Sequence, residues 1–89
     1  MSTEIYINHP NFGLLYRLCI VEKNEELFTT LYAQRLFFKV IIQPQETIFE
    51  PLSRTEARLL VEAKLRRLRG NGEWETYKQV NELYQRTFQ

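Results

Sequence analysis

Residues 31–38 read LYAQRLFF, and this stretch decides how the surrounding chain is expected to fold. It is flanked by Glu26–Leu31, which is short, apolar and threonine-rich, and by Leu36–Ile42, which is rich in aromatic and β-branched residues. Such residues favour strands because bulk close to the main chain packs well on a pleated, half-buried surface. The stretch is therefore predicted to be the end of one strand, a tight corner and the start of the next.

The predicted corner has an unusual composition for a turn between strands. Such turns commonly use Gly, Asn or Asp, which tolerate unusual main-chain angles, whereas this corner carries Tyr32, Gln34 and Arg35. Large planar side chains that form hydrogen bonds are enriched at the centres of protein interfaces. The corner is therefore either a surface for a partner protein or a site covered by another part of the chain.

The composition is that of a small folded protein. The chain has 89 residues, of which 44% are hydrophobic and 13% aromatic, and this favours one folded domain over disorder. The net charge of +1 is too small to indicate nucleic-acid binding by the chain as a whole. Cys19 is the single cysteine, so no disulfide forms within these residues, which fits a reducing compartment. Without a signal-peptide pattern or an apolar run long enough for a membrane span, we expect a cytoplasmic protein with no membrane contact.

Further short strands are predicted on both sides of the corner. Their segments alternate or are largely apolar, and they are Glu4–Ile7, Gly13–Val21 and Thr47–Glu50. Polar or proline-containing turns separate the strands and lie at residues 8–11, 22–25 and 43–46. Four or five short strands joined by short turns are typical of a small antiparallel sheet curled into a barrel.

The pattern changes from strands to helices at residues 53–56, where Ser-Arg-Thr-Glu is a capping box. Apolar residues then recur at helical spacing, which predicts a helix over Arg54–Arg69. We expect Gly70 to end it in the left-handed conformation. A second helix is predicted from about Glu73 to Phe88, and the short connection between the two indicates an antiparallel hairpin.

The second predicted helix has an apolar face that consists of Trp74, Tyr77, Val80, Tyr84 and Phe88. Its stripe of Trp74, Tyr77 and Tyr84 is expected to pack between the two helices or onto the barrel. The sequence thus predicts an α+β fold in two parts. These are a five-stranded antiparallel barrel over residues 1–52 and a helical hairpin over residues 53–89.

The residue types offer little for catalysis or metal binding. The sequence has no Asp, and His9 is its only histidine. A Cys or Ser nucleophile needs a base and commonly an orienting acid, whereas Cys19 lies in a predicted strand, where cysteine is usually a small buried hydrophobe. One Cys and one His also cannot form a typical zinc site. We therefore expect no enzyme, no catalytic residues, no metal and no cofactor.

The first predicted helix suggests a second function, direct binding of nucleic acid. It carries a run of basic residues that could contact phosphates, and these are Arg54, Arg58, Lys64, Arg66, Arg67 and Arg69. Basic residues late in a helix also favour its dipole and form its solvent-exposed face. No aromatic residues interleave with the run, as base stacking requires. Nucleic-acid binding through Arg54–Arg69 is the alternative to a protein-binding role.

Several segments together resemble the family of PII-interacting protein X from cyanobacteria. They are residues 8–10 (NHP), 12–16 (FGLLY), 26–38 (ELFTTLYAQRLFF), 49–51 (FEP), 56–58 (EAR) and 84–88 (YQRTF). The resemblance covers the whole chain, and its central block is long and unbroken. It implies a Tudor-like five-stranded barrel followed by two helices, in agreement with the fold expected from the residues alone.

The same resemblance implies an adaptor and transcriptional coactivator in nitrogen regulation. Members of this family are shared between the signalling protein PII and NtcA, a CRP-like transcription activator. PII holds the adaptor through its T-loops when 2-oxoglutarate is low and ADP is bound, and it releases the adaptor when ATP and 2-oxoglutarate bind. The adaptor then docks on 2-oxoglutarate-bound NtcA. Because the effector binds the partners, we expect this chain to have no small-molecule ligand and no direct contact with DNA.

The resemblance also implies which residues contact the partners. The main set lies at the corner and consists of Tyr32, Gln34, Arg35, Leu36 and Phe38. Further candidates are Glu4, Tyr6, Phe12 and Tyr16 on the barrel and Arg69 on the first helix. We also expect a thin contact between the hairpin and the barrel through Trp74, Tyr77 and Tyr84, which could open when a partner binds.

Overall fold

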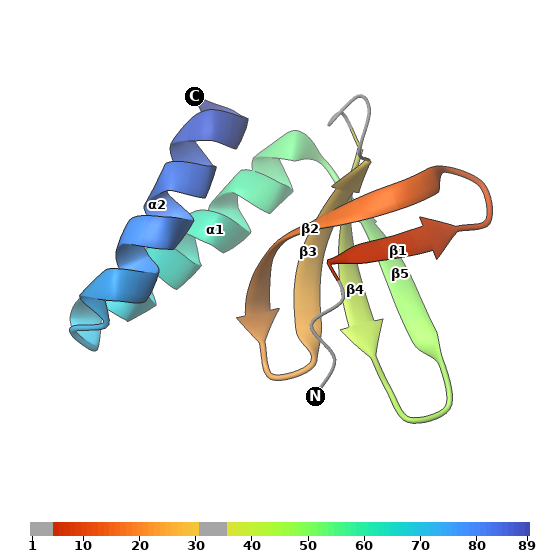
Figure 1. The fold of residues 1–89 in the computed structure, drawn as a ribbon, viewed down its shortest axis with the longest axis horizontal. Helices are drawn as coiled ribbons and strands as arrows, with labels where there is room; N and C mark the ends of the chain where they lie inside the picture. The colour runs from red at the N-terminus through yellow and green to blue at the C-terminus, as the bar shows by residue number, and fades with distance from the viewer. Residues whose placement is uncertain (1–4, 31–35) are drawn as a thin grey trace.

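The computed structural model describes residues 5–30 and 36–89, which form five strands followed by two helices. The strands are β1 (Tyr6–His9), β2 (Gly13–Glu22), β3 (Glu25–Thr30), β4 (Phe37–Ile42) and β5 (Thr47–Leu52). The helices are α1 (Arg54–Gly70) and α2 (Trp74–Phe88). The predicted α+β class and the order of the elements are confirmed (Figure 1).

Each strand pairs antiparallel with its neighbours in sequence, in the order β1-β2-β3-β4-β5. The sheet curls into a half-barrel in which β1 crosses over β5 (Figure 1). Among the described residues, no main-chain hydrogen bond joins β1 to β5, so these two strands are the edges of the sheet. The long strand β2 has two register shifts, and such bulges increase the local twist that curls a sheet.

The largest differences from the predicted strand bounds are in β1 and β5. β1 includes Asn8 and His9, which were expected in a turn, so the connection to β2 is shorter than predicted. β5 continues through Pro51 to Leu52. Proline cannot donate a main-chain hydrogen bond, but β5 is an edge strand, where one row of N–H groups has no partner strand to bond.

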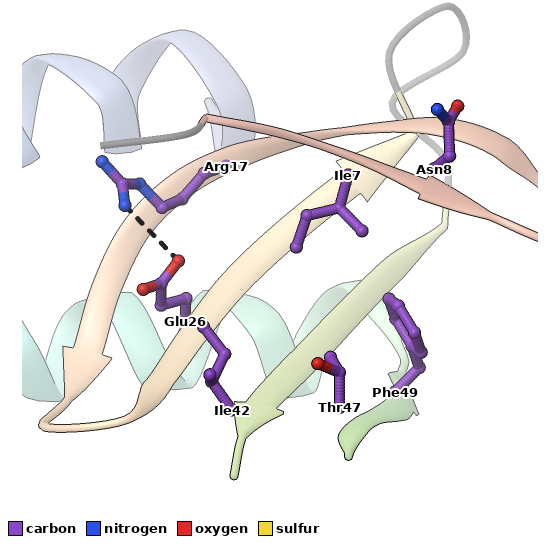
Figure 2. Close-up of a pocket in the computed structure, with 7 residues that line it drawn as sticks. All are labelled: Ile7, Asn8, Arg17, Glu26, Ile42, Thr47 and Phe49. Atoms are coloured by element: carbon purple, nitrogen blue, oxygen red, sulfur yellow. Dashed lines mark hydrogen bonds and ion pairs between the residues drawn. The ribbon is translucent and has the colours of Figure 1, made fainter. Parts of the chain in front are cut away.

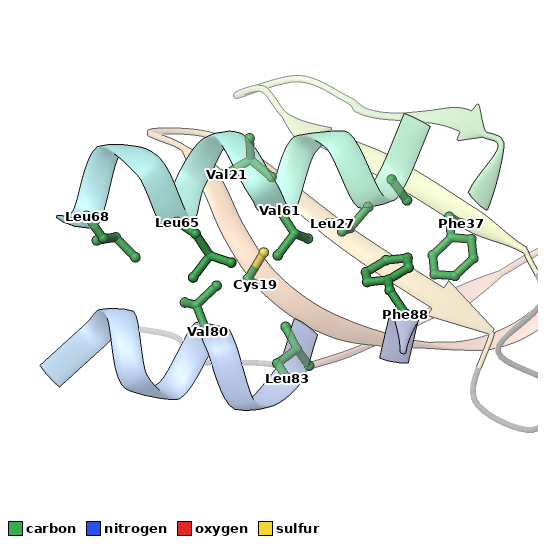
Figure 3. Packing of buried hydrophobic residues seen from close by; sticks show 11 residues of the cluster. Cys19, Val21, Leu27, Phe37, Val61, Leu65, Leu68, Val80, Leu83 and Phe88 are labelled. Carbon is green, nitrogen blue, oxygen red and sulfur yellow. The ribbon is translucent and has the colours of Figure 1, made fainter. Parts of the chain in front are cut away.

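The two faces of the curled sheet bury two different cores. The core inside the curl consists of Leu15, Phe28, Phe38 and Val40, with Ile7 and Phe49 packed against it. On the opposite face, Cys19, Val21, Leu27 and Phe37 pack against the helices (Figure 3). Successive residues of a strand point to opposite faces, which places Phe37 in one core and Phe38 in the other. Burial on both faces explains why β4 is mostly apolar.

Helix α1 begins with the predicted capping box. The Ser53 hydroxyl accepts a hydrogen bond from the N–H of Glu56 at 3.0 Å, and the Glu56 carboxylate accepts one from the N–H of Ser53 at 2.8 Å. These two bonds satisfy main-chain donors that have no partner within the helix. The sequence prediction for the start of α1 is therefore confirmed.

The end of α1 differs from the prediction. Gly70 is the last residue of the helix and not its left-handed stop, because that conformation belongs to Gly72, which has a φ of 72°. The N–H groups of Gly72 and Glu73 donate to the carbonyls of Arg69 and Leu68 at 3.2 and 2.9 Å. This pair of hydrogen bonds is the Schellman motif, in which a left-handed residue follows the helix cap.

Helices α1 and α2 form an antiparallel hairpin that covers the outer face of the sheet (Figures 1 and 3). Their buried residues are Ala57, Val61, Leu65, Leu68, Val80, Leu83 and Phe88. Tyr77 and Tyr84 pack against this cluster. Trp74, which was expected to pack with them, is 58% exposed and touches only the edge of the helical face, with its ring 5.6 Å from that of Tyr77. No helix in the described part of the chain is long and apolar enough to cross a membrane.

Candidate protein-binding surface

The corner between β3 and β4 is held at its base by hydrogen bonds from β3. The carbonyl of Leu36 accepts one from the hydroxyl of Thr29 at 2.8 Å and one from the N–H of Thr30 at 3.2 Å. Thr29 is fully buried, so its hydroxyl bond is protected from water. Thr29 was not among the predicted site residues, and in the sequence it is marked only as one of the two threonines that end β3.

The contact residues implied by the family resemblance differ in their exposure. Glu4, Tyr32, Gln34 and Arg35 lie outside the described residues. The exposed members are Tyr6, Phe12, Leu36 and Arg69. Tyr16 is half-buried and pairs across β1 and β2 with Tyr6, with the two ring centroids 5.7 Å apart. Phe38 differs from the other described members because its side chain is buried.

Phe38 lies inside the barrel at the corner end and packs beneath the more exposed rings there. Its side chain is 3% exposed and belongs to the core inside the curl. The rings of His9 and Phe12 lie 5.3 and 5.5 Å from its ring. Phe12 is 47% exposed and is the outermost ring of this cluster. A partner can therefore touch Phe12 directly, whereas it reaches Phe38 only through the rings above it.

His9 fixes the turn that carries Phe12. Its Nδ1 accepts hydrogen bonds from the N–H groups of Asn11 at 3.0 Å and Phe12 at 3.3 Å. Because two N–H groups donate to it, Nδ1 carries no proton in this arrangement. The ring of His9 also packs edge-on against Phe49 of β5, with 4.8 Å between the centroids. The only histidine of the chain thus has a structural role at this end of the barrel.

Cys19 and His9 lie on opposite faces of the sheet and cannot act as a nucleophile and its base. Cys19 belongs to the core under the helices, whereas the His9 ring packs on Phe38 and Phe49 inside the curl. Burial raises the pKa of the Cys19 thiol to about 11. The thiol therefore keeps its proton at neutral pH, and only the thiolate is a good nucleophile.

Three of the six basic residues in the run on α1 make contacts within the fold. The guanidinium of Arg54 lies 5.4 Å from the centre of the Phe88 ring, where a cation is attracted to the ring face. Arg67 donates a hydrogen bond to the carbonyl of Val21 at 2.8 Å, which ties α1 to β2. Arg58 forms an ion pair with Glu62, one turn further along the helix. These contacts favour the structural interpretation for Arg54, Arg58 and Arg67, whereas Arg66 and Arg69 are exposed.

Helix α2 contacts the sheet through a residue other than the predicted Trp74, Tyr77 and Tyr84. Phe88, at the end of α2, stacks on Phe37 of β4 with 5.5 Å between the ring centroids. Tyr84 contacts α1 instead, because its hydroxyl donates a hydrogen bond to the Glu62 carboxylate. This hydrogen bond raises the pKa of Tyr84. The contact between α2 and the sheet is thus centred on Phe88.

Residues 3–88 match the family model described as PII-interacting protein X. No curated protein sequence matches the chain. The family match extends over the strands and both helices and includes the corner between β3 and β4. It confirms the resemblance seen in the separate sequence segments. On this basis, the chain belongs to the family of PII-interacting protein X.

Proposed function

We propose that this chain is a non-enzymatic adaptor that binds the signalling protein PII through the corner end of its barrel. Family membership over residues 3–88 supports PII as the partner. The observation that carries the choice of surface concerns Leu36. Its side chain is exposed, while its main-chain carbonyl is held by the hydroxyl of the buried Thr29. Exposed apolar side chains on a rigid support suit an interface, because little conformational freedom is lost when a partner binds.

Phe12 extends this surface across the same end of the barrel. The sheet is a simple antiparallel meander, so the β1–β2 and β3–β4 connections lie at the same end. Phe12 is in the first connection and Leu36 is in the second. Both side chains are more than two-fifths exposed. Tyr32, Gln34 and Arg35 lie between β3 and β4 in sequence, and we assign them to the same surface.

We further propose that NtcA uses this surface in exchange with PII. One surface for two partners makes their binding mutually exclusive. When 2-oxoglutarate lowers the affinity of PII for the chain and raises the affinity of NtcA for it, the chain moves from PII to NtcA by mass action. This scheme follows the family resemblance and requires no ligand site for the effector on the chain itself.

Two exposed leucines provide a matched test of the surface. Leu36 at the corner is 43% exposed, and Leu59 on α1 is 52% exposed. We expect Leu36→Ala to weaken PII binding by about tenfold or more, and Leu59→Ala to leave it unchanged. Calorimetric titration against PII with ADP, repeated with ATP and 2-oxoglutarate, measures both effects. If the two variants bind PII with equal affinity, the corner is not the contact surface.

The same titrations separate the adaptor from the nucleic-acid alternative. An adaptor binds PII with ADP and loses this binding with ATP and 2-oxoglutarate. A folded chain that binds PII in neither state contradicts the proposal. In that case, binding of duplex DNA by the chain and by Arg66→Glu and Arg69→Glu variants tests the two exposed arginines near the end of α1.

A further inference from the structure

The open edge of the half-barrel borders a cavity of about 580 Å³ (Figure 2). We call it the seam cavity, and its lining residues are Ile7, Asn8, Arg17, Glu26, Ile42, Thr47 and Phe49. These residues come from all five strands, with β1 on one side and β5 on the other. The contact between His9 and Phe49 closes one end. The other end opens near the β4–β5 turn, away from the corner between β3 and β4.

One row of main-chain groups of β5 points away from β4, on the open side of the sheet. Gln43 and Glu46 form a hydrogen-bonded pair at the base of the β4–β5 turn, with 2.9 Å from N–H to carbonyl. Bonded and non-bonded pairs alternate along an antiparallel ladder. Thr47 and Phe49 therefore direct their N–H and C=O groups away from β4. Pro51, which has no N–H, continues the same row.

No strand in the described part of the chain pairs with this row of β5. An unpaired strand edge is a template on which an extended peptide can form an additional strand. The cavity beside the edge has apolar walls, formed by Ile7, Ile42 and Phe49, and Ile42 is 41% exposed. Edge and cavity together offer main-chain hydrogen bonds and a pocket for an aliphatic side chain.

The polar wall of the cavity favours a basic occupant. Arg17 and Glu26 make a single contact of 3.4 Å, and their side chains are 20% and 15% exposed. This contact occupies one oxygen of the Glu26 carboxylate, so the second oxygen can accept a further bond. The barrel half of the sequence, residues 1–53, has four Lys or Arg against six Glu, a net charge of −2. Arg17 balances the charge of Glu26 within the lining, so the attraction for a cation comes from the free Glu26 oxygen and from the net negative charge of residues 1–53.

We propose that the seam cavity binds an extended, basic segment of a partner protein as an additional strand on β5. The segment pairs its main chain with Thr47 and Phe49 and places an aliphatic side chain among Ile7, Ile42 and Phe49. A Lys or Arg two residues further along points to the same face and pairs with Glu26. The site is separate from the corner, so it does not depend on the proposed binding of PII.

Peptide selection with the full chain as bait tests this proposal. Random peptides displayed on phage are enriched on the chain, and the selected peptides are synthesised and titrated. We expect them to carry an aliphatic residue and a Lys or Arg two positions apart. In amide NMR spectra, the largest shifts on binding are expected at Thr47 and Phe49.

Two substitutions at one position isolate the main-chain contact. Thr47→Pro removes the outward N–H without removing a hydrogen bond to β4, whereas Thr47→Val keeps the N–H and the side-chain shape. We expect Thr47→Pro to weaken peptide binding by about tenfold and Thr47→Val to leave it unchanged. Both variants are expected to bind PII normally, which separates failure of this site from failure of the corner.

Two further measurements keep the test decisive if Thr47→Pro does not fold. Two methylated peptides are prepared, one with methyl groups on the odd-numbered main-chain nitrogens and one with them on the even-numbered nitrogens. Only one of these two sets of N–H groups faces β5, so we expect one methylated peptide to lose binding and the other to keep it. Glu26→Gln is expected to reduce the affinity for the basic peptides by about tenfold. The proposal is overturned if no peptide is enriched, if the enriched peptides are acidic, if both methylated peptides bind, or if β5 of a second chain occupies the edge.

Discussion

The two ends of the half-barrel are built in opposite ways. At the corner end, the rings of His9, Phe12 and Phe38 pack together and close the interior. At the other end, the seam cavity remains open between β1 and β5, with an ion pair in its wall. The same curled sheet thus has one end filled with its own side chains and one end with space for those of another molecule.

This difference implies a different mode of binding for each of the two proposed sites. The closed end is a preorganised surface, in which Leu36 and Phe12 project from fixed supports and a partner adds contacts from outside. The open end offers unpaired main-chain groups and a cavity, so an occupant has to enter it. Substitutions at the closed end are therefore expected to affect stability strongly, and those at the open end to affect it weakly.

The largest expected effect is at the ring cluster. Phe38→Ala removes a ring that is 3% exposed, and we expect it to lower the free energy of unfolding by about 3–5 kcal/mol. Ile42→Ala at the open end removes a side chain that is 41% exposed and should cost less than about 1.5 kcal/mol. Urea unfolding measures both values. Equal losses would contradict the distinction between a filled end and an open end.

A smaller effect is expected at the base of the corner. Thr29→Val keeps the shape of a buried side chain but removes the hydroxyl that donates to the Leu36 carbonyl. We expect a loss of about 1 kcal/mol in unfolding free energy and weaker binding of PII. Thr47→Val removes a hydroxyl at the other end and serves as the control. If Thr29→Val unfolds like the control and binds PII normally, the hydrogen bond does not position the corner.

Local patterns in the sequence were sufficient to predict the elements of this fold. Strand-forming residues around short turns predicted the sheet, and residues 53–56 predicted the start of α1, since a capping box depends only on neighbouring residues. The end of α1 was misplaced because Gly70 and Gly72 both fit a left-handed stop. The positive φ of Gly72 and the main-chain hydrogen bonds distinguish them in the structure.

The candidate sites were predictable to different degrees for a related reason. Large polar residues in the corner are visible in the sequence, so the surface around Leu36 was predicted. The seam cavity is not visible in the sequence, because Ile7 and Phe49 come together only when the sheet curls and β1 lies across β5. The burial of Phe38 also depends on how the sheet folds and was not predicted. Its position beside the corner suggests a contact residue, whereas the alternation of β4 places it inside the curl.

The smallest expected effect concerns the ion pair in the wall of the seam cavity, and two neighbouring glutamates allow a matched comparison. Glu26 pairs with Arg17 inside the cavity, and Glu25 pairs with Lys39 on the other face at 3.9 Å. Water can enter the open cavity, so we expect Glu26→Gln and Glu25→Gln each to change the unfolding free energy by less than about 1 kcal/mol.

A dry cavity would give a different result for Glu26→Gln. Removing one partner of a buried ion pair leaves the other charge unpaired and costs about 3–5 kcal/mol. Such a loss for Glu26→Gln, without one for Glu25→Gln, would mean that the Arg17–Glu26 pair is already sealed inside the barrel. A basic side chain of a partner could then not reach Glu26. A small change for both variants instead leaves the Glu26 carboxylate accessible, as binding of a basic strand requires.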